Sequence, residues 1–329
     1  MAYFILGNEL NKKEKIILNN LSKKVSIKIV SDPHNLNKND ILFMKNPIYT
    51  NHIFTIKRYK NIFAVVKYFF SDKNCREKLS LINNICYGID TIVISCGSSI
   101  NNIDYNFLRE KQKEYIIISV KYIINKLLEN NIQIDFAITS DFKTSKNFEY
   151  NYINTNDYIT FNLSRLSDVT SEYFKKYDFI LSPKIKVKTK NKENYWEKTF
   201  KTIIETNSLD IIKLSENKIK DNILFFNLAH IMLECVLPLA IHIGSNKIYT
   251  IGWDGPSKKG MEYFSEINGE IKKLKAYGRK GKMILHGRQE YKYIKEINKV
   301  FIKNNIFLYK LSIESPINLP YSDLLISHN

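Results

Sequence analysis

The sequence predicts an α/β protein built on a doubly wound, mostly parallel sheet, and three observations support this class. Short runs of apolar and β-branched residues recur along the chain, as in 91–95 and 115–120. Segments with apolar residues at helical spacing lie between these runs. Glycine, serine or aspartate follows several of the runs, which is typical of strand ends. Strands that alternate with helices imply right-handed crossovers and hence parallel pairing.

Residues 1–88 are expected to form an N-terminal α/β accessory region. Its expected elements are strands at Tyr3–Leu6, Val25–Val30 and Asp40–Phe43, a helix at Leu10–Lys24, and helical structure over 53–87. The strands are short apolar or alternating runs, and the helix has apolar residues at a period near 3.6.

Residues 89–329 are expected to form the main domain. Its expected strands are Thr91–Ser95, Tyr115–Val120, Phe136–Thr139, Tyr158–Asn162, Phe179–Leu181, Lys247–Ile251 and Ile306–Leu311. Its expected helices are Tyr122–Asn130, Phe225–Ile243 and Tyr293–Lys303. Pro183–Lys192 alternates lysine with apolar residues, so it is either an exposed edge strand or a basic flap. Residues 271–288 are polar, basic and glycine-containing, which predicts a loop.

The composition is that of a folded protein with an unusual charge. The chain has 329 residues, 44% of them hydrophobic, which excludes a disordered or fibrous class. Its net charge of +17 favours anionic partners such as nucleotides or an anionic membrane face. Much of the charge is attributed to a general abundance of lysine. Because no nucleic-acid-binding motif is present, no nucleic-acid partner is expected.

The four cysteines and the apolar stretches indicate the compartment. No CxxC pair occurs, so neither a disulfide scaffold nor a zinc site is favoured. The N-terminus lacks the pattern of a signal peptide, and the apolar stretches are shorter than the roughly 20 residues of a membrane span. The expected location is therefore the reducing cytoplasm, with peripheral contact to the inner membrane as a further expectation.

The first candidate site is Cys96-Gly97-Ser98-Ser99, directly after a predicted strand. A strand that runs into a glycine turn at the start of a helix exposes backbone N–H groups, which bind anions. Glycine would let a phosphate approach the backbone, and the serines add hydroxyl donors. The alternative is an ordinary strand-to-helix turn, which uses the same residue types.

Two further strands end in candidate residues. Asp141 follows Phe136–Thr139, where it could contact a ribose or base or cap the next helix. Gly252-Trp253-Asp254 follows Lys247–Ile251, where Trp253 could stack on a base or simply pack. Ligands of open α/β sheets bind at the carboxyl ends of the strands. Asp135, at the start of its strand, is interpreted as structural.

His286 lies beside the basic loop and is either a general base or an inert loop histidine. His230 and His242 lie on a predicted apolar helix and are interpreted as core residues. No His, Asp or Glu grouping has the spacing of a metal site, so neither a metal nor another cofactor is expected.

Four segments in register resemble a known family. They are TIVISCGSSINNIDY (91–105), ISVKYIINKLLENNIQIDFAITSD (118–141), PLAIHIGSNKIYTIGWD (238–254) and IKEINKVFIKNNIFLYKL (294–311). They are similar to motifs of the bacterial sialyltransferases of glycosyltransferase family 42 and the related motility-associated (Maf) glycosyltransferases. The resemblance implies a Rossmann-like, mostly parallel sheet of a GT-A-like variant. Cys96, Lys121 and Asp141 stand where the sialyltransferases have nucleotide-contacting asparagines.

The resemblance implies metal-independent, inverting transfer of a nonulosonic acid from a CMP-sugar to a glycan or glycolipid of the cell surface, as in lipopolysaccharide or capsule biosynthesis. His286 would deprotonate the acceptor. Tyr263, the N–H groups of residues 97–99 and Lys121 would stabilise the leaving phosphate. The basic loop 272–282 would close over the donor or remain a solvated surface segment.

Two other functions remain open at this point. Archaeal 6-hydroxymethyl-dihydropterin pyrophosphokinases resemble the same core, and their chemistry would require Mg²⁺ on Asp135, Asp141 or Asp254. A non-enzymatic nucleic-acid-binding protein would instead concentrate its lysines on one face.

Overall fold

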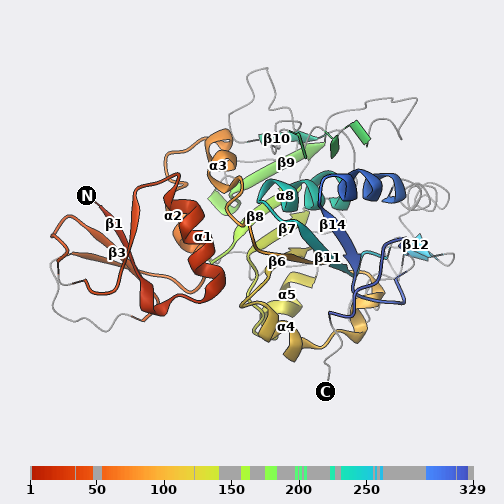
Figure 1. Ribbon diagram of the computed structural model, residues 1–329, viewed down its shortest axis with the longest axis horizontal. Helices are drawn as coiled ribbons and strands as arrows, with labels where there is room; N and C mark the ends of the chain where they lie inside the picture. Colours follow the sequence, from red (N-terminus) through yellow and green to blue (C-terminus); the bar gives the residue numbers. More distant parts are fainter. Residues whose placement is uncertain are drawn as a thin grey trace.

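The computed structural model contains two parallel sheets with helices packed between and around them (Figure 1). The structure describes residues 2–33, 35–46, 54–121, 123–140, 157–163, 175–183, 197–198, 200–201, 204–205, 223–226, 231–254, 256–257, 260–261, 294–315 and 317–324. Every strand pair in the two sheets is parallel, so the predicted α/β class is confirmed. A short antiparallel hairpin, β12 (Pro256–Ser257) with β13 (Gly260–Met261), follows the large sheet's strand β11 in the chain.

The small sheet has the order β2-β1-β3-β4. Its strands are β1 (Tyr3–Leu6), β2 (Ile27–Val30), β3 (Ile41–Met44) and β4 (Thr55–Arg58). A 3₁₀ turn, η1 (Gly7–Glu9), precedes α1 (Lys12–Ser22), and a reciprocal capping box between Asn11 and Glu14 starts the helix. The predicted strands and helix of this region are confirmed.

The predicted helical structure over 53–87 is only partly correct. The segment contains β4 and then two separate helices, α2 (Ile62–Tyr68) and α3 (Cys75–Ile82). Asn61 and Asn74 cap these helices, so each begins anew. The strand β4 was missed because it is an exposed edge strand of four residues without an apolar run.

The large sheet has the order β10-β9-β8-β7-β6-β5-β11-β14. Its strands are β5 (Thr91–Ile94), β6 (Ile116–Val120), β7 (Phe136–Ser140), β8 (Ile159–Leu163), β9 (Phe179–Pro183), β10 (Ile223–Phe226), β11 (Lys247–Ile251) and β14 (Phe307–Lys310). The chain adds strands in one direction from β5 to β10 and then returns to place β11 on the other side of β5. The strand order therefore reverses between β5 and β11.

Helices cover both faces of the large sheet, as in doubly wound folds. One face packs against α2, α3, α8 (Leu237–His242) and the helix 294–303 in the largest apolar cluster. The other packs against α4 (Tyr105–Lys111) and α5 (Ile123–Glu129). Alternate residues of β6 show this division, because Ile116 and Ile118 belong to the first cluster and Ile117 to the second.

The predicted helix Phe225–Ile243 is wrong in its first part. Residues 223–226 form β10, an edge strand of the large sheet. The helix is described from residue 231 and begins with a π-helical stretch, η5 (Met232–Val236), before α8. Pro238 has no N–H to donate to the carbonyl of residue 234, which accounts for a widened turn at this point.

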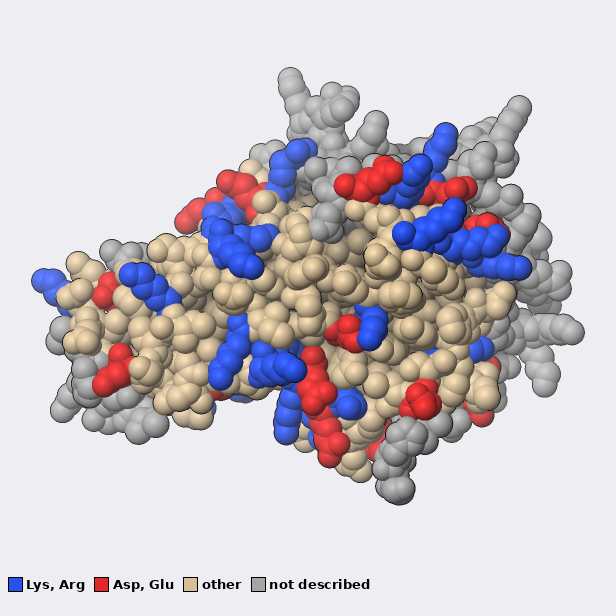
Figure 2. Space-filling view, viewed as in Figure 1, with Lys and Arg blue, Asp and Glu red and all other residues tan. Residues whose placement is uncertain are grey.

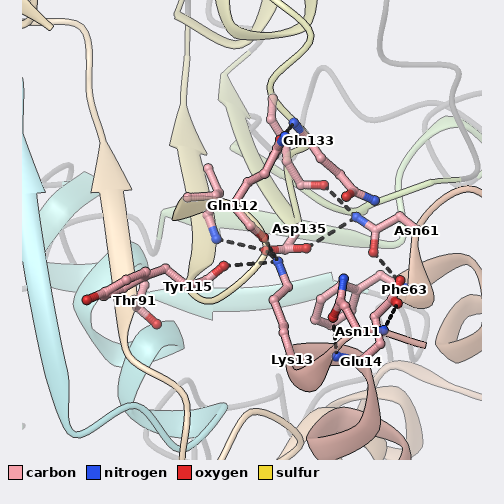
Figure 3. Close-up of polar contacts among 12 residues, drawn as sticks. Asn11, Lys13, Glu14, Asn61, Phe63, Thr91, Gln112, Tyr115, Gln133 and Asp135 are labelled. Carbon is pink, nitrogen blue, oxygen red and sulfur yellow. Dashed lines mark hydrogen bonds and ion pairs between the residues drawn. The ribbon is translucent and has the colours of Figure 1, made fainter. Parts of the chain in front are cut away.

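The N-terminal region is attached to the amino edge of the large sheet. Lys13 of α1 forms a buried ion pair with Asp135, which precedes β7, at 2.5 Å between Nζ and Oδ2 (Figure 3). Its ammonium also donates to the carbonyls of Gln112 and Tyr115, which precede β6. Asp135 also accepts from the Ile117 N–H, at 2.8 Å. The structural interpretation of Asp135 is therefore supported.

A second, partly buried ion pair repeats this arrangement two strands away. Lys67 of α2 pairs with Asp178, which precedes β9, at 3.0 Å. The carboxylate of Asp178 accepts the N–H of Thr160 in β8, as Asp135 accepts an N–H of β6. Both ion pairs lie at the amino ends of strands. The small sheet and α1 therefore lie at the amino edge of the large sheet, away from the carboxyl ends of its strands (Figure 1).

No helix in the described part of the chain has the length and apolar character needed to cross a membrane.

Candidate functional site

The candidate site lies where the strand order of the large sheet reverses. Strands β5 and β11 are neighbours, and from β5 the chain continues to β6 on the other side. The segments that follow β5 and β11 therefore meet at the carboxyl edge of the sheet. Ligands of open α/β sheets bind at this kind of position. The structure thus brings two sequence-predicted segments together, Cys96–Ser99 and Gly252–Asp254.

Three hydrogen bonds join these two segments. The Gly97 N–H donates to the Gly252 carbonyl at 2.8 Å, and the Gly252 N–H donates to Ser99 Oγ at 3.0 Å. The Ser99 N–H donates to Asp254 Oδ2 at 2.7 Å. Asp254 is buried, and its carboxylate packs against the turn. We call this arrangement of Gly97, Ser99, Gly252 and Asp254 the switch-point lock.

The lock changes the role expected for the turn after β5. The N–H groups of Gly97 and Ser99 were expected to hold a phosphate, but both are already bonded to protein acceptors. The turn also opens a five-residue 3₁₀ helix, η2 (Ser98–Asn102), rather than an α-helix. The helix-dipole argument for an anion site therefore does not apply here. The two amides instead fix the positions of both segments.

The two glycines of the lock are required by close approach of backbone to backbone. A Cβ on Gly97 would lie 2.5 Å from both Asp254 Oδ2 and the Gly252 carbonyl oxygen. A Cβ on Gly252 would lie 2.1 Å from the Ser95 carbonyl oxygen, and its φ is +71°. Only glycine fits at both positions. Packing between the segments, rather than access of a phosphate, therefore explains these residues.

Two other predicted residues point into the apolar clusters. Cys96 is 5% exposed and packs with the residues under α4 and α5. Burial raises the pKa of its thiol, and the nearby Lys121 ammonium opposes that shift. Trp253 is 4% exposed and belongs to the largest cluster, which supports the packing interpretation over base stacking.

Lys121, which the resemblance places beside the leaving phosphate, is described by the structure and lies at this edge of the sheet. It directly follows β6, is half-buried, and its N–H donates to the Ile138 carbonyl of β7 at 2.7 Å. Its φ is 60°, in the left-handed region. The other described non-glycine residues with positive φ are asparagines and one aspartate, which tolerate that region far better. Residues held in sparsely populated backbone conformations cluster at active sites and ligand clamps, so Lys121 is a candidate functional residue.

A row of buried polar side chains lies beside Lys121 and is not apparent from the sequence. Ser119, Thr139 and Asn162 lie on neighbouring strands and are all fully buried. Asn162 Nδ2 donates to Thr139 Oγ1 at 2.8 Å, whereas Ser119 Oγ has no hydrogen-bond partner among the described residues. Buried parallel strands normally carry apolar residues on both faces. Each residue looked unremarkable in its own strand, so only the strand order reveals the row.

Several predicted site residues lie outside the described residues. They are Asp141, Tyr263 and His286, together with the segments 184–192 and 272–282; the Ser98 backbone is described but its side chain is not. His230 also lies outside. His242 is buried, and its Nε2 lies 2.8 Å from the Leu79 carbonyl, so the core interpretation of His242 is supported.

The described residues give little support to a magnesium site. No group of three or more His, Cys, Asp or Glu side chains among them could hold a metal ion. Asp135 lies at the amino edge of the sheet and is paired with Lys13, whereas Asp254 lies at the carboxyl edge. These two carboxylates cannot share a cation. Asp135 is thus removed from the ligand set that the pyrophosphokinase alternative requires.

Comparison with known proteins gives distant structural matches. No protein-family model and no curated protein sequence matches the chain. A structure of the sialyltransferase CstII from Campylobacter jejuni with CMP aligns at 14% identity over 74% of this chain and 88% of that chain, with a TM-score of 0.36. A structure of the same enzyme with CMP-3FNeuAc aligns at 14% identity over 73% and 90%, with a TM-score of 0.40. At these values, the function has to be argued from the chain's own residues.

Proposed function

We propose that the protein is a glycosyltransferase that transfers a nonulosonic acid from a CMP-activated donor to a glycan acceptor of the cell surface. The observation that carries the proposal is the meeting of Cys96–Ser99, Lys121 and Gly252–Asp254 at the point where the strand order reverses. These segments belong to three of the four motifs that resemble the family 42 sialyltransferases and the related Maf glycosyltransferases.

The proposed reaction is a single displacement without a metal. The acceptor hydroxyl oxygen forms a bond to the anomeric carbon, and the bond from that carbon to the phosphate oxygen breaks. The hydroxyl proton passes to His286, and CMP leaves with the bonding electrons. Lys121 balances the negative charge that grows on the phosphate, because an ammonium at a half-buried site acts through a lower effective dielectric than one in water. Tyr263 is proposed to donate to the same phosphate.

We further propose that residues 89–329 form the catalytic domain and that residues 1–88 are accessory. The two regions share a core, because α2 and α3 belong to the same apolar cluster as the large sheet. The accessory region thus supplies part of one helical layer. The proposed location is the reducing cytoplasm, which suits four free cysteines that are all buried.

A thermal-shift series tests the proposal. The protein would be melted with CMP, CDP, UDP, ADP and ATP, each with Mg²⁺ and with EDTA. A ligand at about 100 times its dissociation constant stabilises the fold by about 2.7 kcal/mol. We expect CMP to raise the melting temperature equally with and without Mg²⁺. Stabilisation by ATP that requires Mg²⁺ would instead support the pyrophosphokinase, and no response to any nucleotide would refute both activities.

A further inference from the structure

Among the residues that the structure describes, exposed positive charge is densest on the N-terminal lobe, by which we mean residues 2–61, the small sheet with α1. Among the described residues of this lobe, nine basic side chains are exposed against one acidic side chain, Asp32. In the rest of the described chain, ten exposed basic side chains are balanced by eleven acidic ones. A general abundance of lysine would raise the charge everywhere. Over the whole sequence, residues 2–61 carry a net charge of +7 and the other 269 residues one of +10, so the lobe is the more basic region per residue.

Three of the four acidic side chains of the lobe are buried or half-buried. Glu14 and Asp40 are buried, and both accept backbone N–H groups within the fold. Of the nine exposed basic side chains, five lie on α1 and on the edge strands β2 and β4. On the face drawn in Figure 2, Lys and Arg side chains are spread over the lobe at the left. Some acidic side chains are visible on the same face, but among the described residues the exposed basic side chains of the lobe outnumber the acidic ones.

We propose that the N-terminal lobe binds an anionic lipid bilayer. Clusters of basic side chains are attracted to the negative surface potential of such bilayers. The lobe also exposes an apolar side chain among these charges, because Ile29 of β2 is 52% exposed and follows Lys28. A basic surface with an exposed aliphatic side chain suits the region between lipid headgroups and acyl chains.

Nucleic acid fits this surface less well. Proteins that bind single strands stack bases on exposed aromatic rings. In the described part of the lobe, every aromatic side chain is at least half-buried, and Tyr59 is only 3% exposed. The α-helix described in the lobe, α1, has 11 residues and is held against the large sheet through Lys13.

The position of the lobe is compatible with this role. The ion pairs of Lys13 and Lys67 hold the N-terminal region at the amino edge of the large sheet. The switch-point lock lies at the opposite, carboxyl edge. Contact of the lobe with a bilayer therefore leaves the candidate site open to a soluble nucleotide. The proposal for the lobe does not depend on the reaction proposed for that site.

Sedimentation of the full chain with vesicles tests the proposal. The lobe variant replaces six exposed residues of the lobe by Gln: Lys12, Lys15, Lys28, Lys57, Arg58 and Lys60. The control variant replaces six exposed lysines elsewhere by Gln: Lys113, Lys201, Lys247, Lys295, Lys299 and Lys303. Both variants lose the same charge. Melting curves would establish that both remain folded.

We expect the wild type to bind vesicles that contain about 30% phosphatidylglycerol and to dissociate at high salt. Each basic side chain near such a surface strengthens binding about fivefold. If at least two of the six replaced side chains lie near the surface, the lobe variant should bind at least about 25-fold more weakly. The control variant should stay within about threefold of the wild type, because exposed charges beyond a Debye length are screened. Ile29→Ser should weaken binding to vesicles without changing binding to RNA.

Three results would overturn the proposal. The first is equal loss of binding in the two six-residue variants, which would mean that net charge alone attracts the protein. The second is unchanged binding of the lobe variant. The third is tighter binding of the wild type to RNA than to anionic vesicles at the same salt concentration, which would assign the lobe to nucleic acid.

Discussion

Replacement of Lys121 by glycine is expected to weaken nucleotide binding while leaving the fold at least as stable. The left-handed conformation costs a non-glycine residue about 1–2 kcal/mol. Glycine adopts it freely but adds about 0.4–1 kcal/mol of conformational entropy to the unfolded chain. Because Lys121 has a φ of 60°, the two contributions leave Lys121→Gly between neutral and about 1.6 kcal/mol more stable than the wild type.

The same substitution removes the ammonium that the proposed function places beside the phosphate. A hydrogen bond to a charged group contributes about 1.5–3 kcal/mol. CMP should therefore bind roughly 10- to 150-fold more weakly to Lys121→Gly than to the wild type. Stability would be measured by urea unfolding and affinity by isothermal titration calorimetry with CMP in EDTA.

Asn131 offers a matched control. It also has a positive φ, 58°, but it precedes β7 and so lies at the amino edge of the sheet. Asn131→Gly should leave CMP affinity unchanged, with at most a small change in stability. Undiminished CMP affinity of Lys121→Gly would refute the role of Lys121 in binding. A loss of more than about 1 kcal/mol of stability would show that the lysine serves the fold instead.

Further predictions concern the lock, the buried ion pair, one carboxylate and the cysteines. Gly97→Ala should cost about 1–3 kcal/mol of unfolding free energy, because its Cβ would lie 2.5 Å from the Asp254 carboxylate; an unchanged urea midpoint would contradict the geometry of the lock. Lys13→Met should lower the unfolding free energy by about 3–5 kcal/mol, because it leaves the buried Asp135 carboxylate without its ion-pair partner. The double variant Lys13→Met with Asp135→Leu should lose clearly less in urea unfolding, whereas additive losses would mean that the two residues are not coupled. Hydrogen bonds from the Asn37 and Ala2 N–H groups lower the pKa of Asp40. The wild type should therefore be more stable than Asp40→Ala above pH 3.8, the ordinary pKa of the carboxyl, and this difference should disappear as the pH falls through the folded-state pKa. A stability difference that grows in acid would contradict the assigned direction of the shift. All four cysteines are buried, so a thiol reagent should label the native protein slowly and the unfolded protein at once; rapid labelling of Cys96 would place its thiol in an open site.

Most strands were predictable because each is a short, strongly apolar run. TIVI of β5 and IIISV of β6 are buried on both faces, so their composition alone marks them. The strand β10 was not predictable, since Phe225 and Phe226 run into further apolar residues and one continuous helix accounts for that pattern equally well. The edge strand β4 carries mostly polar residues and gave no signal.

The sequence predicted which residues form the candidate site but not how they contact one another. Gly97 and Asp254 were both recognised because they follow buried strands. Their direct contact was not, because Ser99 and Asp254 are 155 positions apart and only the pairing of β5 with β11 brings them together. The conformation of Lys121 was also invisible in the sequence, since lysine rarely adopts a positive φ.

A crystal structure of the protein soaked with CMP in EDTA tests the central claim most directly. The quantity to measure is the distance from the phosphorus atom to Lys121 Nζ. The proposed function predicts a phosphate at the carboxyl edge of β5, β6 and β11, within roughly 4 Å of that ammonium and without a metal ion. A nucleotide bound elsewhere on the protein, or a phosphate held through a cation, would contradict the proposal.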